Sequence, residues 1–443
     1  MGAGKTTIGR EVARLTHRQF VDLDALIGKR HGPIPELFRR SEPEFRRIEE
    51  ETLAEVLAGR ETVVALGGGA VLSPLNRERL RARAFTVYLD VDVKTAWERV
   101  RGSDRPLAQR EDDFRRLYES RQRIYGEVAE AVVRDADGAL LACLRIAFER
   151  GARLMLEEPS ALVADRRVLE LHPPPLVPSS THPVPAGEEA KTIEIVRRLW
   201  EELGIGREGS IVAFGGGSTT DVAGFVAATY LRGVRWIAVP TTLTGQVDAA
   251  IGGKTGINTP GGKNLAGAFH FPARVVIDPD VLATLPENER RAGTAEVVKT
   301  GLLAGREVWA LPEEEMIRAC AAYKAAVVLS DPYETEGRRT VLNLGHTFAH
   351  ALEAGSGYAV PHGDAVALGL LAALRLSGLP TDAVEDVLRP APVAADPDAA
   401  WAALKRDKKG EGVFVLLEAP GKPVVTTVPD DAARRALTAL IRK

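Results

Sequence analysis

Three histidines in the C-terminal half stand at spacings that suit a catalytic metal site. His346 and His350 are four residues apart, so they share one face of a helix, and His362 follows soon after. Glu296 lies upstream, in the run Ala-Glu-Val-Val-Lys. One glutamate and two histidines form a suitable zinc-binding set that leaves a coordination position open for substrate. A lone histidine is more often structural, but each of these lies in a motif, so a metal site is the favoured interpretation.

Several cations lie beside glycine and asparagine in apolar stretches, which is unusual for side chains that only solvate a surface. Lys299 comes one helical turn after Glu296, and Asn343 lies close to the first of the histidines. A site with so many cations predicts a substrate that carries both phosphate and carboxylate groups. The cations are Lys254, Lys263, Lys299, Lys324 and Arg339.

Two glycine-rich loops predict nucleotide phosphate sites. The first comprises Gly2, Gly4, Lys5, Thr6 and Thr7, the second half of the phosphate-binding pattern G-x-x-x-x-G-K-S/T. Its backbone N–H groups would hold the phosphates of ATP, Lys5 would reach the β- and γ-phosphates, and the Thr6 hydroxyl would bind Mg²⁺. The first glycine of this pattern and the strand that normally precedes it are missing.

The second loop runs from Phe214 through Gly215, Gly216 and Gly217 to Asp221. It follows an expected strand and opens an expected helix, which predicts close approach of a dinucleotide phosphate. Iron-type alcohol and glycerol dehydrogenases carry a similar loop, so the metal and lysine residues must decide between these functions.

The strands and helices expected around these residues predict an α/β fold. With 443 residues, two or three domains are expected. Residues 1–150 predict a parallel sheet with its first strand missing, 151–287 an α/β NAD-binding lobe, and 288–443 a mainly α-helical metal-binding lobe. Expected strands are Gln19–Asp22, Thr62–Leu66, Phe85–Leu89, Ser210–Phe214, Trp236–Val239 and Arg274–Ile277. The Pro- and Ser-rich stretch 172–187 predicts a linker or loop.

Composition argues against several other classes. The 58 Lys and Arg residues nearly balance the 61 Asp and Glu residues, which disfavours nucleic acid or a membrane surface as the main partner. Cys143 and Cys320 are the only cysteines, so neither a disulfide framework nor a cysteine zinc site is expected. No apolar run reaches the roughly 18 residues that span a bilayer. A cytoplasmic location fits best.

Residues 1–150 resemble the shikimate kinase family. The resemblance depends on the phosphate loop followed in order by an Asp-x-Asp pair, a helical arginine, a glycine triplet and two further arginines. It implies that Asp24 binds the substrate hydroxyls, that Asp22 lies near Mg²⁺, and that Arg105 closes on the transferring phosphoryl group. Further contacts to shikimate are implied for Arg46, Gly67, Gly68, Gly69 and Arg121.

The run from Glu188 to Lys409 resembles 3-dehydroquinate synthase. Motifs such as Ile-Gly-Gly-Lys-Thr, Gly-Lys-Asn-Leu and Leu-Asn-Leu-Gly-His occur in order. The resemblance implies that Glu296, His346 and His362 bind Zn²⁺ or Co²⁺, and that His350 transfers protons. Substrate contacts are implied for Asp248, Lys254, Asn264, Lys299, Lys324, Arg339, Asn343 and one lysine of the pair 408–409. NAD contacts are implied for Glu188, Lys191, Gly215, Gly216, Gly217, Asp221, Thr241, Thr242 and Lys263.

The resemblance also implies the reaction. A heptulosonate phosphate would be oxidised transiently at C4 by NAD, lose phosphate, be reduced again and close to 3-dehydroquinate. Arg232 would reach a neighbouring subunit's substrate phosphate, which implies a homodimer. The early strands of this family are missing before Gly151, so 153–158 is the first expected strand, and Glu157 or Glu158 stands where an aspartate binds the adenosine ribose.

Four alternatives remain open at this level. The first half could be another small P-loop metabolite kinase, such as a gluconate kinase, although the pairing of Asp-x-Asp with Gly-Gly-Gly-Ala favours shikimate. The synthase half alone could work beside a truncated, inactive kinase half. The second half could be a metal-dependent polyol dehydrogenase, although such an enzyme needs no phosphate-binding cations. A scaffold without turnover is disfavoured by the complete set of metal ligands.

Overall fold

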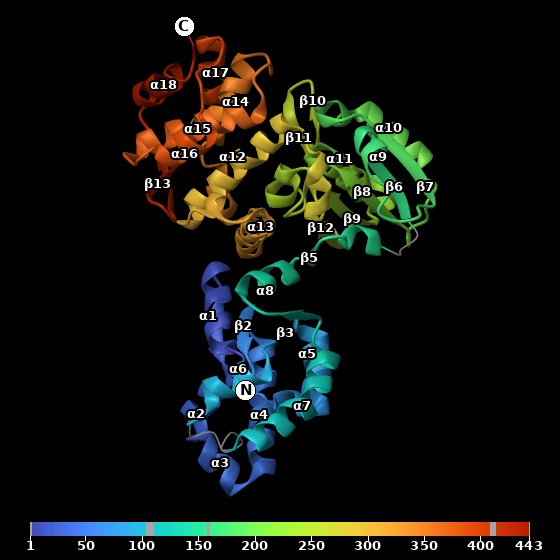
Figure 1. Cartoon of the computed structure of the whole chain (residues 1–443), viewed down its shortest axis with the longest axis vertical. Helices are drawn as coiled ribbons and strands as arrows, with labels where there is room; N and C mark the ends of the chain where they lie inside the picture. Colours follow the sequence, from blue (N-terminus) through green and yellow to red (C-terminus); the bar gives the residue numbers. More distant parts are fainter. Residues whose placement is uncertain (1, 103–109, 157–159, 408–412, 443) are drawn as a thin grey trace. The chain divides into compact units, whose positions relative to one another are not determined.

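The computed structural model describes residues 2–102, 110–156, 160–407 and 413–442. The chain divides into two compact units, Met1–Cys143 and Leu144–Lys443, which are treated separately (Figure 1). The residues 144–150 were expected in the first unit. They belong to the second because Ile146–Phe148 forms a strand of the second unit's sheet.

The first unit alternates helices with four short parallel strands. Its strands are β1 (Gln19–Asp22), β2 (Thr62–Ala65), β3 (Val87–Leu89) and β4 (Ala131–Val133). Its α-helices are α1 (Lys5–Leu15), α2 (Leu23–His31), α3 (Ile34–Arg40), α4 (Glu42–Ala58), α5 (Pro74–Arg83), α6 (Val93–Val100), α7 (Glu111–Val128) and α8 (Ala136–Cys143), with a 3₁₀ turn η1 (Ala70–Leu72).

The sheet of the first unit is in two halves. Strand β1 pairs with β2, and β3 pairs with β4, all in parallel, while no pairing joins β2 to β3 in the described residues. A mainly apolar cavity of about 120 Å³ is lined by residues of β3, by Leu66 directly after β2 and by Phe114 of α7. The N-terminal phosphate loop contributes Ala3 and Lys5 to the same cavity. In the described residues, the loop therefore lies beside a gap between the two pairs of strands.

The second unit is built on a six-stranded parallel sheet with the strand order β5-β12-β9-β8-β6-β7. The central strand β8 is buried along its whole length, as its unbroken apolar run Ile-Val-Ala-Phe predicts for a strand covered on both faces. The strands are β5 (Ile146–Phe148), β6 (Ser160–Asp165), β7 (Ser180–Val184), β8 (Ser210–Gly215), β9 (Arg235–Pro240) and β12 (Arg274–Ile277). Helices α9 (Arg166–Leu171), α10 (Ile193–Glu202) and α11 (Gly217–Thr229) connect them, with the short turns η2 (Ala152–Met155), η3 (Gly187–Ala190) and η4 (Tyr230–Arg232).

Two expectations about residues 151–191 are wrong. The Pro- and Ser-rich stretch contains β7, whose Pro183 is accommodated because β7 is an edge strand of the sheet. The first strand of this region after β5 is Ser160–Asp165, whereas Arg153 lies in the 3₁₀ turn η2. The side chain of Arg153 is buried against Asp278, which explains why this segment turns into the unit.

The rest of the unit is mainly helical. An antiparallel hairpin of β10 (Lys254–Thr259) and β11 (Gly262–Phe269) precedes it, and a second hairpin of β13 (Val413–Ala419) and β14 (Lys422–Thr427) packs on it. Its helices are α12 (Glu287–Ala304), α13 (Glu313–Ser330), α14 (His346–Gly355), α15 (His362–Ser377), α16 (Asp382–Leu388), α17 (Pro397–Asp407) and α18 (Asp430–Thr438). The turns are η5 (Gly245–Ala249), η6 (Pro279–Thr284), η7 (Val308–Ala310) and η8 (Arg338–Asn343).

This helical lobe has its own hydrophobic core, in which α15 contributes a nearly continuous buried run from Ala365 to Leu374. None of the helices in the described part of the chain combines the length and apolarity needed to cross a bilayer.

Candidate active sites

The N-terminal phosphate loop has the backbone geometry that its glycines predict. Gly2 and Gly4 have φ values of 74° and 83°, in the left-handed region that glycine adopts without strain. Gly4 caps α1, so the first N–H groups of the helix are not occupied by a capping side chain. The Thr6 hydroxyl donates to Asp22 Oδ2 at 2.7 Å. A hydroxyl beside a carboxylate suits the water-rich coordination of Mg²⁺.

The glycine triplet of the first unit meets the expected substrate residues. A Cβ on Gly67 would overlap Asp24 Oδ1, and one on Gly69 would overlap the Arg46 guanidinium. The carbonyl of Gly68 accepts hydrogen bonds from Arg121 at 3.3 Å and from Tyr125 at 2.7 Å. The structure thus brings Arg46, Arg121 and Asp24 together at the glycine triplet that follows β2. Arg105 lies outside the described residues.

Glu49 is a buried carboxylate of this site that the sequence analysis did not single out. It pairs with Arg46 at 2.7 Å, and burial raises its pKa although the arginine opposes this shift. Its spacing of three residues from Arg46 on α4 is the signal that could have identified it. Glu49 fixes the guanidinium that faces the glycine triplet.

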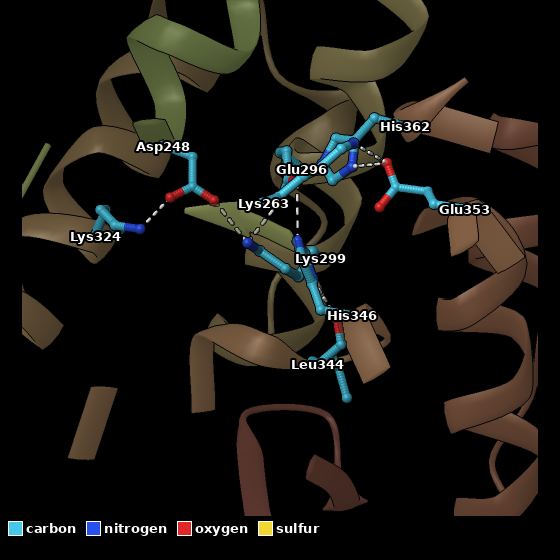
Figure 2. A network of polar contacts seen from close by, with 9 residues as sticks. All are labelled: Asp248, Lys263, Glu296, Lys299, Lys324, Leu344, His346, Glu353 and His362. Atoms are coloured by element: carbon cyan, nitrogen blue, oxygen red, sulfur yellow. Dashed lines mark hydrogen bonds and ion pairs between the residues drawn. The ribbon is translucent and has the colours of Figure 1, made fainter. Parts of the chain in front are cut away.

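The three expected metal ligands converge in the second unit. Glu296 Oε1 lies 3.4 Å from Nε2 of His346 and 3.4 Å from Nε2 of His362 (Figure 2). The ligand atoms of the three residues lie within 4.8 Å of one another. They come from the middle of α12 and from the first residues of α14 and α15. His350 follows one turn after His346, with 5.7 Å between the ring centroids.

Charge compensation holds this group together. Burial would raise the pKa of Glu296, but Lys299 and the two imidazoles outweigh burial and hold it well below its usual range. Burial would lower the pKa of His362, yet the two neighbouring glutamates, Glu296 and Glu353, raise it to about 10. Burial lowers the pKa of His346 despite Glu296, so the two histidines differ in basicity. A divalent cation would replace the positive charge that protonated His362 supplies.

A second polar group adjoins the metal ligands. Lys299 Nζ lies 2.6 Å from Glu296 and 2.7 Å from Asp248, and Lys324 also contacts Asp248 (Figure 2). Asp248 is presented by the π-helical turn η5, a type of local irregularity that is frequent at functional sites. Burial lowers the pKa of Lys324 although Asp248 opposes the shift. Asp248 therefore pairs with two lysines, Lys299 and Lys324, that differ in proton affinity.

Other expected substrate residues make their direct contacts with different partners, although the charge of Arg339 acts on Lys324 and that of Asp248 acts on Arg339. Arg339 is buried and donates to the carbonyl groups of Gly252 at 3.1 Å and Pro332 at 2.9 Å. Lys254 is half-exposed and pairs with Glu334 at 2.6 Å. Asn343 and Arg232 are exposed. Lysines 408 and 409 lie outside the described residues.

The glycine loop after β8 opens α11 as expected, and a Cβ on Gly215 would overlap the Thr219 side chain. Thr241 N donates to the Gly215 carbonyl at 2.9 Å, which places the segment after β9 against the loop. Thr242 adjoins Gly216. The loop is thus a close-packed cradle at the carboxyl end of the sheet, where parallel α/β folds bind ligands.

The residues expected to contact NAD fall into two groups of neighbours at the β10–β11 hairpin. Lys191 contacts both Asp221, at 2.6 Å, and Asn264, which was expected to touch substrate. The ammonium nitrogen of Lys263, which was expected to touch NAD, lies 3.2 Å from Glu353 Oε1. These neighbours separate because successive side chains of a strand point to opposite faces. Glu188 accepts hydrogen bonds from Ser218 at 3.3 Å and Asn258 at 2.6 Å, and burial raises the pKa of Asp221 to about 6.

Two further functional candidates, besides Glu49, were missed in the sequence. Asp165 ends β6, next to β8, where an acidic residue binds the adenosine ribose in dinucleotide folds. Glu157 and Glu158, expected in that role, lie outside the described residues. The signal for Asp165 was its place after the apolar run Ala-Leu-Val-Ala. The other candidate is Glu353, seven residues after His346.

Fold and sites together define a chain of two enzyme types, a P-loop kinase followed by a metal-dependent enzyme with a dinucleotide-binding sheet. Family comparison agrees with this division. Residues 1–145 match the shikimate kinase family, 181–292 the N-terminal domain of 3-dehydroquinate synthase, and 293–409 its C-terminal domain.

A bifunctional shikimate kinase/3-dehydroquinate synthase from Thermotoga maritima is 34% identical over 406 residues, covering 84% of this chain and 82% of the relative. The chain belongs to this bifunctional family, and it is an enzyme of the shikimate pathway with both domains. The resemblance seen in the motifs and the expected fold class are thereby confirmed.

Relatives of the second unit extend the comparison. A 3-dehydroquinate synthase from Thermobifida fusca is 45% identical over 285 residues, covering 56% of this chain and 76% of the relative. The solved structure of 2-deoxy-scyllo-inosose synthase with carbaglucose-6-phosphate, NAD⁺ and Co²⁺ has a TM-score of 0.59 at 26% identity, covering 66% of this chain and 96% of the other.

Proposed function

We propose that the second unit converts 3-deoxy-D-arabino-heptulosonate 7-phosphate to 3-dehydroquinate and phosphate with NAD and Zn²⁺ or Co²⁺, and that the first phosphorylates shikimate with ATP and Mg²⁺. The observation that carries the proposal is the direct contact between the metal-ligand set and the lysine–aspartate group, linked through Lys299. A simple dehydrogenase needs a metal and a nicotinamide, but no cage of cations for a phosphorylated acid.

The metal-ligand set fits a catalytic divalent ion. One carboxylate and two imidazoles, with ligand atoms within 4.8 Å, suit Zn²⁺ or Co²⁺ and leave positions for substrate oxygens. When bound, such an ion supplies Lewis-acid polarisation of those oxygens. Glu296, His346 and His362 would hold it, and the 2-deoxy-scyllo-inosose synthase structure, which contains Co²⁺, supports this choice.

The glycine loop fits NAD. The residues Gly215 to Gly217 leave no room for side chains at the start of α11, so backbone N–H groups can approach a pyrophosphate. Asp165 would bind the ribose, and Lys191 and Asp221 would order the loop from the other side. When bound, NAD supplies the hydride acceptor and later the hydride donor.

The side chains of this chain then divide the remaining work. Lys299, held between two carboxylates, is a fixed cation for an anionic substrate group. Lys324 is the better proton donor of the two lysines because burial lowers its pKa. Asp248 orients both lysines. His350, one turn from His346, is the proposed proton-transfer residue, and Lys254, Arg339 and Asn343 would complete substrate binding.

In the first unit, Lys5 would neutralise the transferring phosphoryl group and Thr6 with Asp22 would hold Mg²⁺. Arg46, Arg121 and Asp24 would bind the carboxylate and hydroxyls of shikimate. Guanidinium groups suit the carboxylate because of their paired donors. The divided sheet beneath the loop favours a second candidate for this unit, a kinase domain with low or no turnover.

We also propose a cytoplasmic homodimer. Arg232 supports it, because this arginine is exposed and stands in the turn η4 with a φ of 65°. Its guanidinium would reach the substrate phosphate of a second subunit.

One assay tests the synthase. Purified protein receives the heptulosonate phosphate, NAD and Zn²⁺, and inorganic phosphate is measured with and without a chelator. We expect chelator-sensitive phosphate release without net NADH, and none from Glu296→Gln. Net NADH from glycerol with no phosphate release would instead establish a polyol dehydrogenase. Shikimate-dependent ADP formation by the same protein separates an active kinase unit from an inactive one.

A further inference from the structure

Glu353 is a buried carboxylate beside the metal-ligand set for which no role was foreseen. It lies on α14, two turns after His346, and is only 3% exposed. Glutamate is almost never buried to this extent without a partner. Its partners therefore indicate what it does.

The two ring nitrogens of His362 face different glutamates (Figure 2). Nε2 lies 3.4 Å from Glu296, the third member of the ligand set, and Nδ1 lies 3.4 Å from Glu353 Oε1. Both nitrogens of the ring therefore have a carboxylate neighbour. Nε2 faces the metal-ligand set, and Nδ1 faces the supporting carboxylate of Glu353.

The other ligand imidazole is supported differently. His346 turns Nε2 towards Glu296, while its Nδ1 lies 3.2 Å from the carbonyl of Leu344. Both imidazoles therefore have an acceptor behind them, but only His362 has a charged one. A carboxylate behind a metal-binding imidazole fixes its tautomer and orientation and raises its basicity.

Glu353 is itself held in place from the β10–β11 hairpin. Lys263 Nζ on β11 lies 3.2 Å from Glu353 Oε1 and 4.7 Å from the centroid of the Tyr358 ring. Tyr358 has a φ of 65°, so the loop between α14 and α15 adopts an uncommon backbone conformation to present this ring. Two separate elements, β11 through Lys263 and α15 through His362, therefore converge on one carboxylate oxygen of α14.

We propose that Glu353 is a positioning residue that presents His362 to the metal with Nδ1 protonated and Nε2 free to bind. The inference rests on the proposed metal site, and it goes beyond the three ligands to a residue that contacts one of them.

The test measures metal affinity rather than turnover. Zn²⁺ binding to the full chain is titrated against a chelator, and the absorption spectrum of the Co²⁺ form reports the ligand geometry. We expect Glu353→Gln to weaken Zn²⁺ binding by about 10- to 100-fold, the range found for lost outer-shell partners, and to alter the Co²⁺ spectrum. Glu353→Asp keeps the charge but retracts it by one methylene, so a smaller loss of about threefold or more is expected.

Asp364→Asn is the matched control. Asp364 also lies on α15, two residues from His362, but its carboxylate pairs with Arg291 at 2.7 Å. It should leave Zn²⁺ affinity unchanged. Wild-type affinity in both Glu353 variants, or an equal loss in Asp364→Asn, would overturn the role of Glu353 while leaving the metal site intact. No metal binding by the wild-type chain would overturn both.

Discussion

Lys299 offers a direct test of how charge is balanced in the second unit. Its side chain is 2% exposed, and its ammonium nitrogen lies 2.7 Å from Asp248 and 2.6 Å from Glu296. These carboxylates raise the pKa of Lys299 against the opposing effect of burial, so the side chain is charged. We predict that Lys299→Met destabilises the metal-free protein strongly, because it leaves two buried carboxylates without their shared cation.

The expected fall in unfolding midpoint follows from the typical free energy of a buried ion pair and the typical entropy of unfolding. Removing one partner of a buried ion pair costs about 3–5 kcal/mol. The second unit has 300 residues, from Leu144 to Lys443, and an unfolding entropy of about 2.1 cal/mol/K per residue gives roughly 0.6 kcal/mol/K. The unfolding midpoint of the unit should therefore fall by about 5–8 °C.

Saturating Zn²⁺ should reduce the difference in unfolding midpoint between the wild type and Lys299→Met, because a cation bound by Glu296 neutralises a carboxylate that Lys299 otherwise compensates. Thermal unfolding of the wild type and of Lys299→Met, each with chelator and with Zn²⁺, measures this difference in midpoint. Lys254→Met serves as the control, since Lys254 pairs with Glu334 at a half-exposed site where such pairs contribute about 0–1 kcal/mol. A midpoint for Lys299→Met within 2 °C of the wild type in chelator would refute the reasoning.

Four further predictions concern other parts of the chain. Gly69→Ala should displace the Arg46 guanidinium and weaken shikimate binding about tenfold or more, with an unfolding midpoint close to wild type; unchanged calorimetric affinity would contradict this. Arg121→Met should weaken shikimate binding by about 10- to 100-fold in the same titration, because a buried charged donor is lost. An apolar five-residue strand added ahead of the phosphate loop should pair with β2 and β3 and raise the unfolding midpoint of the first unit by about 3 °C or more, while a polar extension of equal length should not. Burial raises the pKa of Cys320 to about 12, so at pH 8 only about one thiol in 10⁴ is ionised; alkylation should therefore require denaturant, and rapid labelling of the folded protein would disprove burial of this thiol.

The sequence predicted those parts of the site that lie within short motifs. Glu296, His346 and His362 could be grouped because each motif names its ligand, and the structure brings them together although 66 residues separate the first from the last. The strands around the glycine loop were predicted to within a residue, because fully buried parallel strands are unbroken apolar runs.

What could not be predicted depends on partners that are distant in the sequence. The contact of Glu353 with Lys263 joins residues 90 positions apart. Without knowledge of that contact, a glutamate on a helix is expected to be a solvated side chain. The opposite directions of Lys263 and Asn264 depend on the register of a hairpin. Proline in β7 was misleading because only the sheet order shows that the strand lies at an edge.

The order of elements along the chain has a consequence for synthesis. All six strands of the large sheet lie between Ile146 and Ile277, whereas the last metal ligand is His362. Nascent chains fold from the N-terminus at roughly 5–20 residues added per second, so the 85 residues between these points take roughly 4–17 s to appear. During that interval the nucleotide lobe emerges without its helical partner, and the set of metal ligands stays incomplete until His362 has been added.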